Sequence, residues 1–90
     1  MAINRELLLS YADAAGWTRV RSSNVHSVAY SADFKYLFIR YGGQKGKPVT
    51  TYIYRDVDAG VFQGLLAAPS KGEYVARVVK PHFHDFDRLE

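Results

Sequence analysis

Residues 25–57 contain mostly β-branched and aromatic side chains, and this stretch most constrains the fold of the chain. Two segments of turn composition interrupt it, at 31–33 and at 42–48. Parallel strands need crossovers of roughly a dozen residues or more, which neither interruption can provide. We therefore predict a three-stranded antiparallel β-meander, with two strands within 25–41 and the third at 49–57.

A helix is predicted near the start of the chain. Asn4 can cap it, and Gly16 can adopt the left-handed conformation that ends many helices. Ile3 and Leu8 have the spacing of a hydrophobic staple. The apolar face of this helix consists of Leu7, Leu8, Tyr11, Ala14 and Ala15. Such an amphipathic helix needs a surface on which to lie.

Two further short helices are predicted after the meander. Asp58 can cap the first, and Pro69 ends it. Ser70 and Glu73 have the spacing of a capping box, in which each side chain satisfies a free backbone N–H. Because Glu73 would occupy this helix end, the pattern favours a structural role for Ser70 over an anion site. The predicted fold is α+β: an N-terminal helix, the three-stranded meander, and two short C-terminal helices on one face.

Composition limits the class of protein. Ninety residues fit one domain, and a hydrophobic fraction of 48% is typical of a packed core. The absence of cysteine excludes disulfides and thiolate metal sites and favours a reducing compartment. No apolar run approaches the roughly 18 residues of a membrane span, and the first residues lack signal-peptide features. We expect a cytoplasmic protein that does not enter a membrane.

The charge is unevenly distributed. Residues 1–80 hold eleven Lys and Arg against six Asp and Glu, a net charge of +5, whereas residues 81–90 hold one against three, a net charge of −2. A basic body attracts phosphate backbones or acidic protein surfaces, and the attraction weakens as salt rises.

Several segments together resemble the KTSC domain family. They are Ser22-Ser23-Asn24-Val25, Ser27-Val28-Ala29-Tyr30, Leu37-Phe38-Ile39-Arg40-Tyr41, Tyr52-Ile53-Tyr54 with Asp56-Val57, Leu65-Leu66-Ala67-Ala68 and Ser70-Lys71-Gly72-Glu73-Tyr74. The family is named for a C-terminal extension of some lysyl-tRNA synthetases and includes small bacterial and phage proteins. The resemblance divides the chain into an N-terminal helix and linker (1–21), a KTSC-like domain (22–81) and an acidic tail (82–90). It implies RNA binding only through the synthetase context.

Residue parity divides the second strand between two faces. Leu37, Ile39 and Tyr41 should face the C-terminal helices, which places Tyr36, Phe38 and Arg40 on the other face. The family usually has polar residues where this chain has Tyr36 and Phe38. The N-terminal helix can cover these aromatics, or they can stack on bases or contact a protein.

The predicted function is binding of RNA or another nucleic acid by a small non-enzymatic protein. The sequence has no P-loop order and no recognisable nucleophile motif. His82-Phe83-His84-Asp85 lacks a fourth ligand and a rigid frame for zinc, so we expect no metal and no cofactor. The predicted nucleic-acid contacts are Arg40, Lys45, Lys47, Arg55 and Lys71.

The alternative function is a protein-interaction module, such as a phage-encoded modulator of a bacterial host protein. Its contact surface would consist of Tyr36, Phe38, Leu8 and Tyr11. The N-terminal helix can also exchange between the two copies of a homodimer. A pocket for a small nucleotide is neither indicated nor excluded by the sequence.

Overall fold

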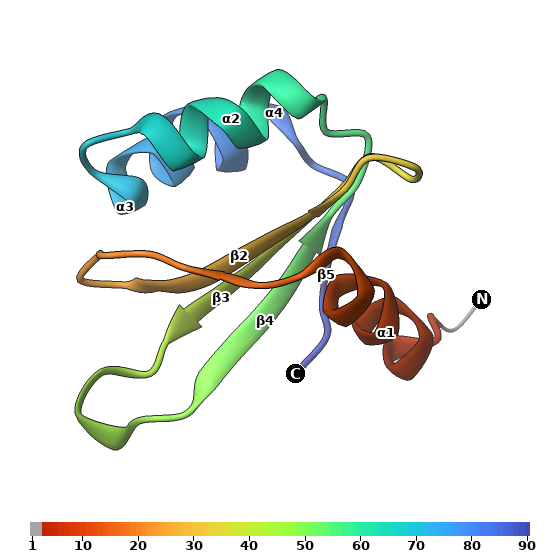
Figure 1. Cartoon of the computed structure of the whole chain (residues 1–90), viewed down its shortest axis with the longest axis horizontal. Coiled ribbons are helices and arrows are strands. Elements are labelled where there is room, and N and C mark those ends of the chain that lie inside the picture. Colours follow the sequence, from red (N-terminus) through yellow and green to blue (C-terminus); the bar gives the residue numbers. More distant parts are fainter. Residues whose placement is uncertain (1–2) are drawn as a thin grey trace.

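In the computed structural model, which describes residues 3–90, one antiparallel sheet has helices on both faces (Figure 1). Its five strands are ordered β1-β2-β3-β4-β5. The elements in chain order are α1 (Arg5–Ala15), β1 (Thr18–Arg19), β2 (Val25–Ser31), β3 (Tyr36–Gly42), η1 (Gln44–Gly46), β4 (Val49–Tyr54), α2 (Ala59–Ala67), α3 (Lys71–Tyr74), η2 (Val75–Val79), α4 (Lys80–His82) and β5 (Phe86–Arg88). No helix within residues 3–90 is long and apolar enough to cross a bilayer.

The prediction of an α+β class is confirmed, but the prediction of a three-stranded sheet is wrong. The meander β2-β3-β4 forms the centre, and one short strand is added at each edge. β1 pairs with β2 at Thr18 and Arg19, and β5 pairs with β4 through Phe86, Asp87 and Arg88. Both added strands satisfy backbone groups that an open edge would leave unpaired. Within the acidic segment 82–90, residues 86–88 therefore complete the sheet as β5.

The predicted division of β3 between two faces is confirmed. Leu37 and Ile39 are fully buried in a core that they share with Leu65 of α2 and Val79 of η2. Phe38, also fully buried, belongs to a second core that includes Ala12 of α1. Helix α1 therefore covers the aromatic side of β3, as the first of the three interpretations expected.

The helix caps follow the predicted pattern only in part. The Leu7 N–H donates to Asn4 Oδ1 at 3.0 Å, and Gly16 has a φ of 93° at the end of α1. The Glu73 N–H donates to Ser70 Oγ at 3.2 Å. The Glu73 carboxylate, however, pairs with Arg77 at 2.9 Å, and no side-chain cap bond is made by Asp58. The structure thus contains the Ser70 half of the predicted capping box.

Two adjacent leucines of α2 test the assignment of the helix-covered core. Leu65 is fully buried, whereas Leu66 is 39% exposed. Leu65→Ala should lower the free energy of unfolding by about 2–5 kcal/mol because it opens a cavity. Leu66→Ala should change it by less than about 1 kcal/mol. Urea unfolding followed by circular dichroism measures both, and equal losses would contradict the assignment.

Candidate nucleic-acid interface

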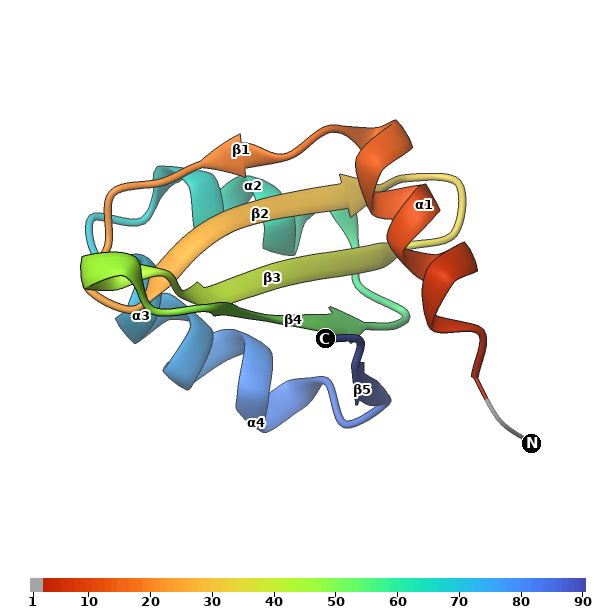
Figure 2. The same ribbon diagram turned by 90° about the horizontal axis from the view of Figure 1, so that it is seen from below.

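A row of polar and cationic side chains crosses the sheet beyond α1. Its two neutral members, Ser27 and Thr51, are buried, whereas Arg19 is exposed and Arg40 is half-buried. Figure 2 shows α1 over the end of the sheet near the β2–β3 turn, whereas the β3–β4 hairpin, with its short helical turn η1, lies at the other end. Strand register places Arg19 opposite Ser27, Ser27 opposite Arg40, and Arg40 opposite Thr51. Directly paired residues share a face, so we call these four residues the cationic row.

Arg40 lies at the centre of the cationic row and is held in place by two groups. Its guanidinium carbon lies 3.9 Å from the centroid of the Trp17 ring, a cation–π contact. Its Nη2 lies 3.9 Å from Glu90 Oε1, which also accepts a hydrogen bond of 2.8 Å from Thr51 Oγ1. The buried Nε of Arg40 has no hydrogen-bond partner among residues 3–90. Trp17 and Glu90 therefore fix the position of the Arg40 side chain, which is 25% exposed.

His26 reports the positive potential of the row. Its Nδ1 lies 3.0 Å from the Ser27 hydroxyl, and its ring lies beside the backbone of Gly43. Burial lowers the pKa of His26, and the charges of Arg19 and Arg40 lower it further. The imidazole is therefore neutral at neutral pH and lies within reach of both arginine charges.

The β3–β4 hairpin places two more cations beside this surface. Lys45 lies in η1 with a left-handed φ of 53°, and Lys47 follows at the end of the turn. Both are exposed, and neither makes an ion pair within the described chain. Arg19 and Arg21 are likewise exposed without an ion pair in residues 3–90.

The other two predicted contacts, Arg55 and Lys71, lie away from the row and have internal partners. Arg55 Nη1 lies 2.8 Å from Asp87 and 3.2 Å from Asp85. Burial lowers the pKa of Arg55, but hydrogen bonds and charge from the two aspartates outweigh burial and raise it. Lys71 Nζ donates to the Leu66 and Ala68 carbonyls at the end of α2. Arg55 and Lys71 therefore make contacts that stabilise the fold. The structure does not bring the five predicted cations together.

The residues of the alternative protein interface lie mostly under or within α1. Phe38 is fully buried, so a partner would reach it only if α1 moved away. Tyr36, Leu8 and Tyr11 are half-buried and pack against the same core. Phe34, which the sequence analysis did not select, stacks on Tyr11 at 4.8 Å and is 49% exposed.

Sequence reasoning missed Arg19, Arg21 and His26. The alternation of Arg19-Val20-Arg21 was the available signal, because it places two cations on one side of an extended segment. Its two-residue strand is too short to be recognised, and its partner strand begins after a loop. His26 lies where the pairing register between β2 and β3 shifts, between Val25 and Ser27. At such a shift, the alternation of side chains along a strand no longer predicts which face of the sheet a residue occupies.

The fold and this surface define a small α+β domain with a basic region of the sheet that α1 does not cover. The model of the KTSC domain matches residues 21–83, and the chain belongs to the KTSC domain family. A protein from Tsukamurella paurometabola is 38% identical over 64 residues, which cover 71% of this chain and 88% of that protein. The crystal structure of a KTSC domain protein from Yersinia pestis matches with a TM-score of 0.71 and 28% identity, over 82% of this chain and 96% of the other.

The electrostatic coupling within the row can be measured at His26. Arg19→Gln removes one of the two charges that lower the His26 pKa, so this pKa should rise towards its usual value of about 6.5. Arg21→Gln is the matched control, because Arg21 is not among the groups that shift His26. An NMR titration of the His26 ring protons measures both variants. An unchanged pKa in Arg19→Gln would contradict the geometry of the row.

Proposed function

We propose that this protein is a small, non-enzymatic protein that binds RNA or another nucleic acid through its phosphate backbone. The observation that carries the proposal is the basic part of the sheet beyond α1, where Arg40 is fixed in position and four other cations, on β1 with its following loop and on the β3–β4 hairpin, are exposed and make no ion pair within residues 3–90. These four cations are Arg19, Arg21, Lys45 and Lys47. Arginine and lysine in such an arrangement bind phosphates by charge.

The arrangement favours contact with the backbone over recognition of base sequence. Arg19 and Arg40 lie on strands separated by β2, roughly 10 Å apart at the usual strand spacing. This distance allows them to contact different phosphates of one strand. Phosphate contacts position a nucleic acid but carry no direct sequence information. We therefore expect binding that depends strongly on salt and weakly on sequence.

The hairpin lysines test the proposal with a matched control. Lys45→Ala/Lys47→Ala should weaken binding of a fluorescently labelled single-stranded RNA and lower the slope of log affinity against log salt by roughly 1.4, about 0.7 per lost phosphate contact. The control, Lys35→Ala/Arg77→Ala, removes the same charge from exposed residues that already pair with Asp58 and Glu73. Fluorescence anisotropy at several salt concentrations gives both slopes.

Two results would contradict nucleic-acid binding. One is the absence of binding by the wild-type protein at low salt, and the other is equal slopes for the two double variants. A pull-down from bacterial lysate, with and without nuclease, addresses the alternative function. A partner that survives nuclease treatment would favour a protein-interaction module.

The pH dependence of RNA binding follows from His26. Its pKa is lowered by burial and by Arg19 and Arg40, so the free protein holds a neutral imidazole at neutral pH. A bound phosphate offsets the arginine charges, which raises the pKa and makes the complex take up a proton. The affinity should therefore increase as pH falls from about 7.5 to about 5.5, through the usual histidine range. His26→Gln should flatten this increase, and an unchanged pH profile would contradict contact at this position.

A further inference from the structure

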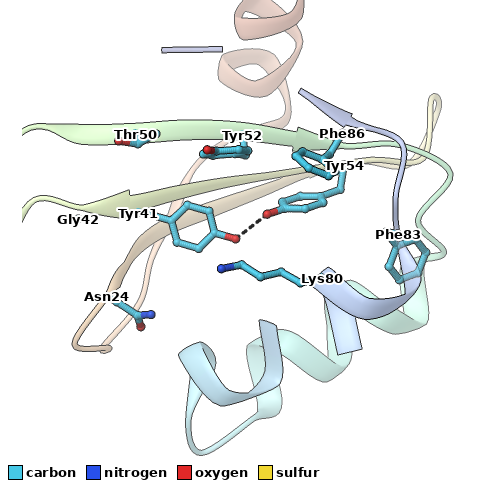
Figure 3. Close-up of a pocket in the computed structure, with 9 residues that line it drawn as sticks. All are labelled: Asn24, Tyr41, Gly42, Thr50, Tyr52, Tyr54, Lys80, Phe83 and Phe86. Atoms are coloured by element: carbon cyan, nitrogen blue, oxygen red, sulfur yellow. Dashed lines mark hydrogen bonds between the residues drawn. The ribbon is translucent and has the colours of Figure 1, made fainter. Parts of the chain in front are cut away.

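A groove lies on the helix-covered side of the sheet, between β3, β4 and β5 and the helical segment that ends in α4. Its volume is about 660 Å³, which is within the ~300–1,000 Å³ of small-molecule pockets. Nine residues line this aromatic groove, and Figure 3 shows them: Asn24, Tyr41, Gly42, Thr50, Tyr52, Tyr54, Lys80, Phe83 and Phe86. Five of the nine are aromatic and one is charged.

Two tyrosine hydroxyls inside the groove provide a hydrogen-bond donor. The hydroxyl oxygens of Tyr41 and Tyr54 lie 2.7 Å apart. One hydroxyl donates to the other, so the pair uses only one of its two protons, and the second has no other partner among residues 3–90. Burial raises the pKa of both tyrosines above the usual value, so both remain protonated at neutral pH. The pair therefore offers one O–H donor.

Lys80 adds a positive charge next to this donor. Its ammonium lies 5.4 Å from the centroid of the Tyr41 ring, and Figure 3 shows its side chain extending alongside the hydroxyl pair. Lys80 is exposed and makes no ion pair or hydrogen bond within the described part of the chain. The ammonium and the phenolic proton together can hold one anionic group.

Flat aromatic surface lies next to the anion-binding groups. Tyr52 stacks on Tyr54 at 6.4 Å between ring centroids with an interplanar angle of 23°, and Phe86 lies 6.2 Å from Tyr52. Phe86 is 50% exposed. An aromatic ligand that covers Tyr52 and Phe86 would remove apolar surface from water and gain stacking contacts.

We propose that the aromatic groove binds a nucleoside monophosphate, with its base on Tyr52 and Phe86 and its phosphate at Lys80 and the tyrosine hydroxyl pair. An uncharged apolar ligand would leave the ammonium and the phenolic donor unpaired. A phosphate without a base would leave the aromatic wall in water. The groove and the cationic row lie on opposite faces of the sheet, so this proposal does not depend on the proposed function.

The test uses the full chain labelled with ¹⁵N and the four nucleotides AMP, GMP, CMP and UMP. At least one should shift the backbone amide signals of Tyr52, Lys80 and Phe86 in a saturable way. Adenosine and ribose 5-phosphate, which each lack one of the two recognised groups, should bind at least about tenfold more weakly than AMP if AMP binds. Tight binding of ribose 5-phosphate alone would overturn recognition of the base.

Two exposed substitutions with matched controls locate the site. Lys80→Gln should weaken nucleotide binding by about tenfold or more, whereas Arg77→Gln, on the preceding helical turn, should not. Phe86→Ala should weaken binding by about 5- to 150-fold through lost stacking. Phe34→Ala, of similar exposure on another surface, is its control. Failure of all four nucleotides to shift the groove, or wild-type affinity in Lys80→Gln, would overturn the proposal.

Discussion

The central strands β2, β3 and β4 bury side chains on both faces, and this double burial determines where every other element can lie. Leu37 and Ile39 point into one core and Phe38 into the other, and all three are fully buried. A sheet with two apolar faces needs two covers. Helices α2 and the 71–82 segment provide one cover, and α1 provides the other. The surfaces available for binding are the parts of the two sheet faces that these helices do not cover.

The covers leave a different surface on each face. On the α1 side the helix lies away from the β3–β4 hairpin (Figure 2). Beyond the helix, the Arg40 guanidinium lies against the Trp17 ring and near Glu90. A charged residue in this position also contributes to the potential of the surface. On the opposite side the helical segment lies far enough from β4 to leave a groove lined by Tyr52 and Phe86. The surface left on the α1 side therefore includes the Arg40 guanidinium, whereas the groove on the other side is lined mainly by aromatic rings and by Lys80.

Elements with a strong local pattern could be predicted from the sequence, and elements that form through distant pairing could not. Alternation in β3 was sufficient to assign Leu37 and Phe38 to opposite faces, and Asn4 and Ser70 cap their helices as expected. β1 and β5 contain two and three residues and lack strand composition, so only the open edges of β2 and β4 explain them. Edge pairing of this kind leaves little signal in a single sequence.

The same difference between local patterns and distant pairing explains why the five cations predicted to bind nucleic acid do not lie together in the structure. The cations were selected by type and exposure, but the groups that neutralise them lie far along the chain. Arg55 forms ion pairs with Asp85 and Asp87 because the chain folds back and β5 pairs with β4. An arginine that stabilises an edge strand is less available to a phosphate than an unpaired lysine on a hairpin. Formation of β5 thus places acidic charge next to Arg55 and Arg40, whereas the cations of the β1 edge and the hairpin make no ion pair within residues 3–90, and a polyanion can approach them.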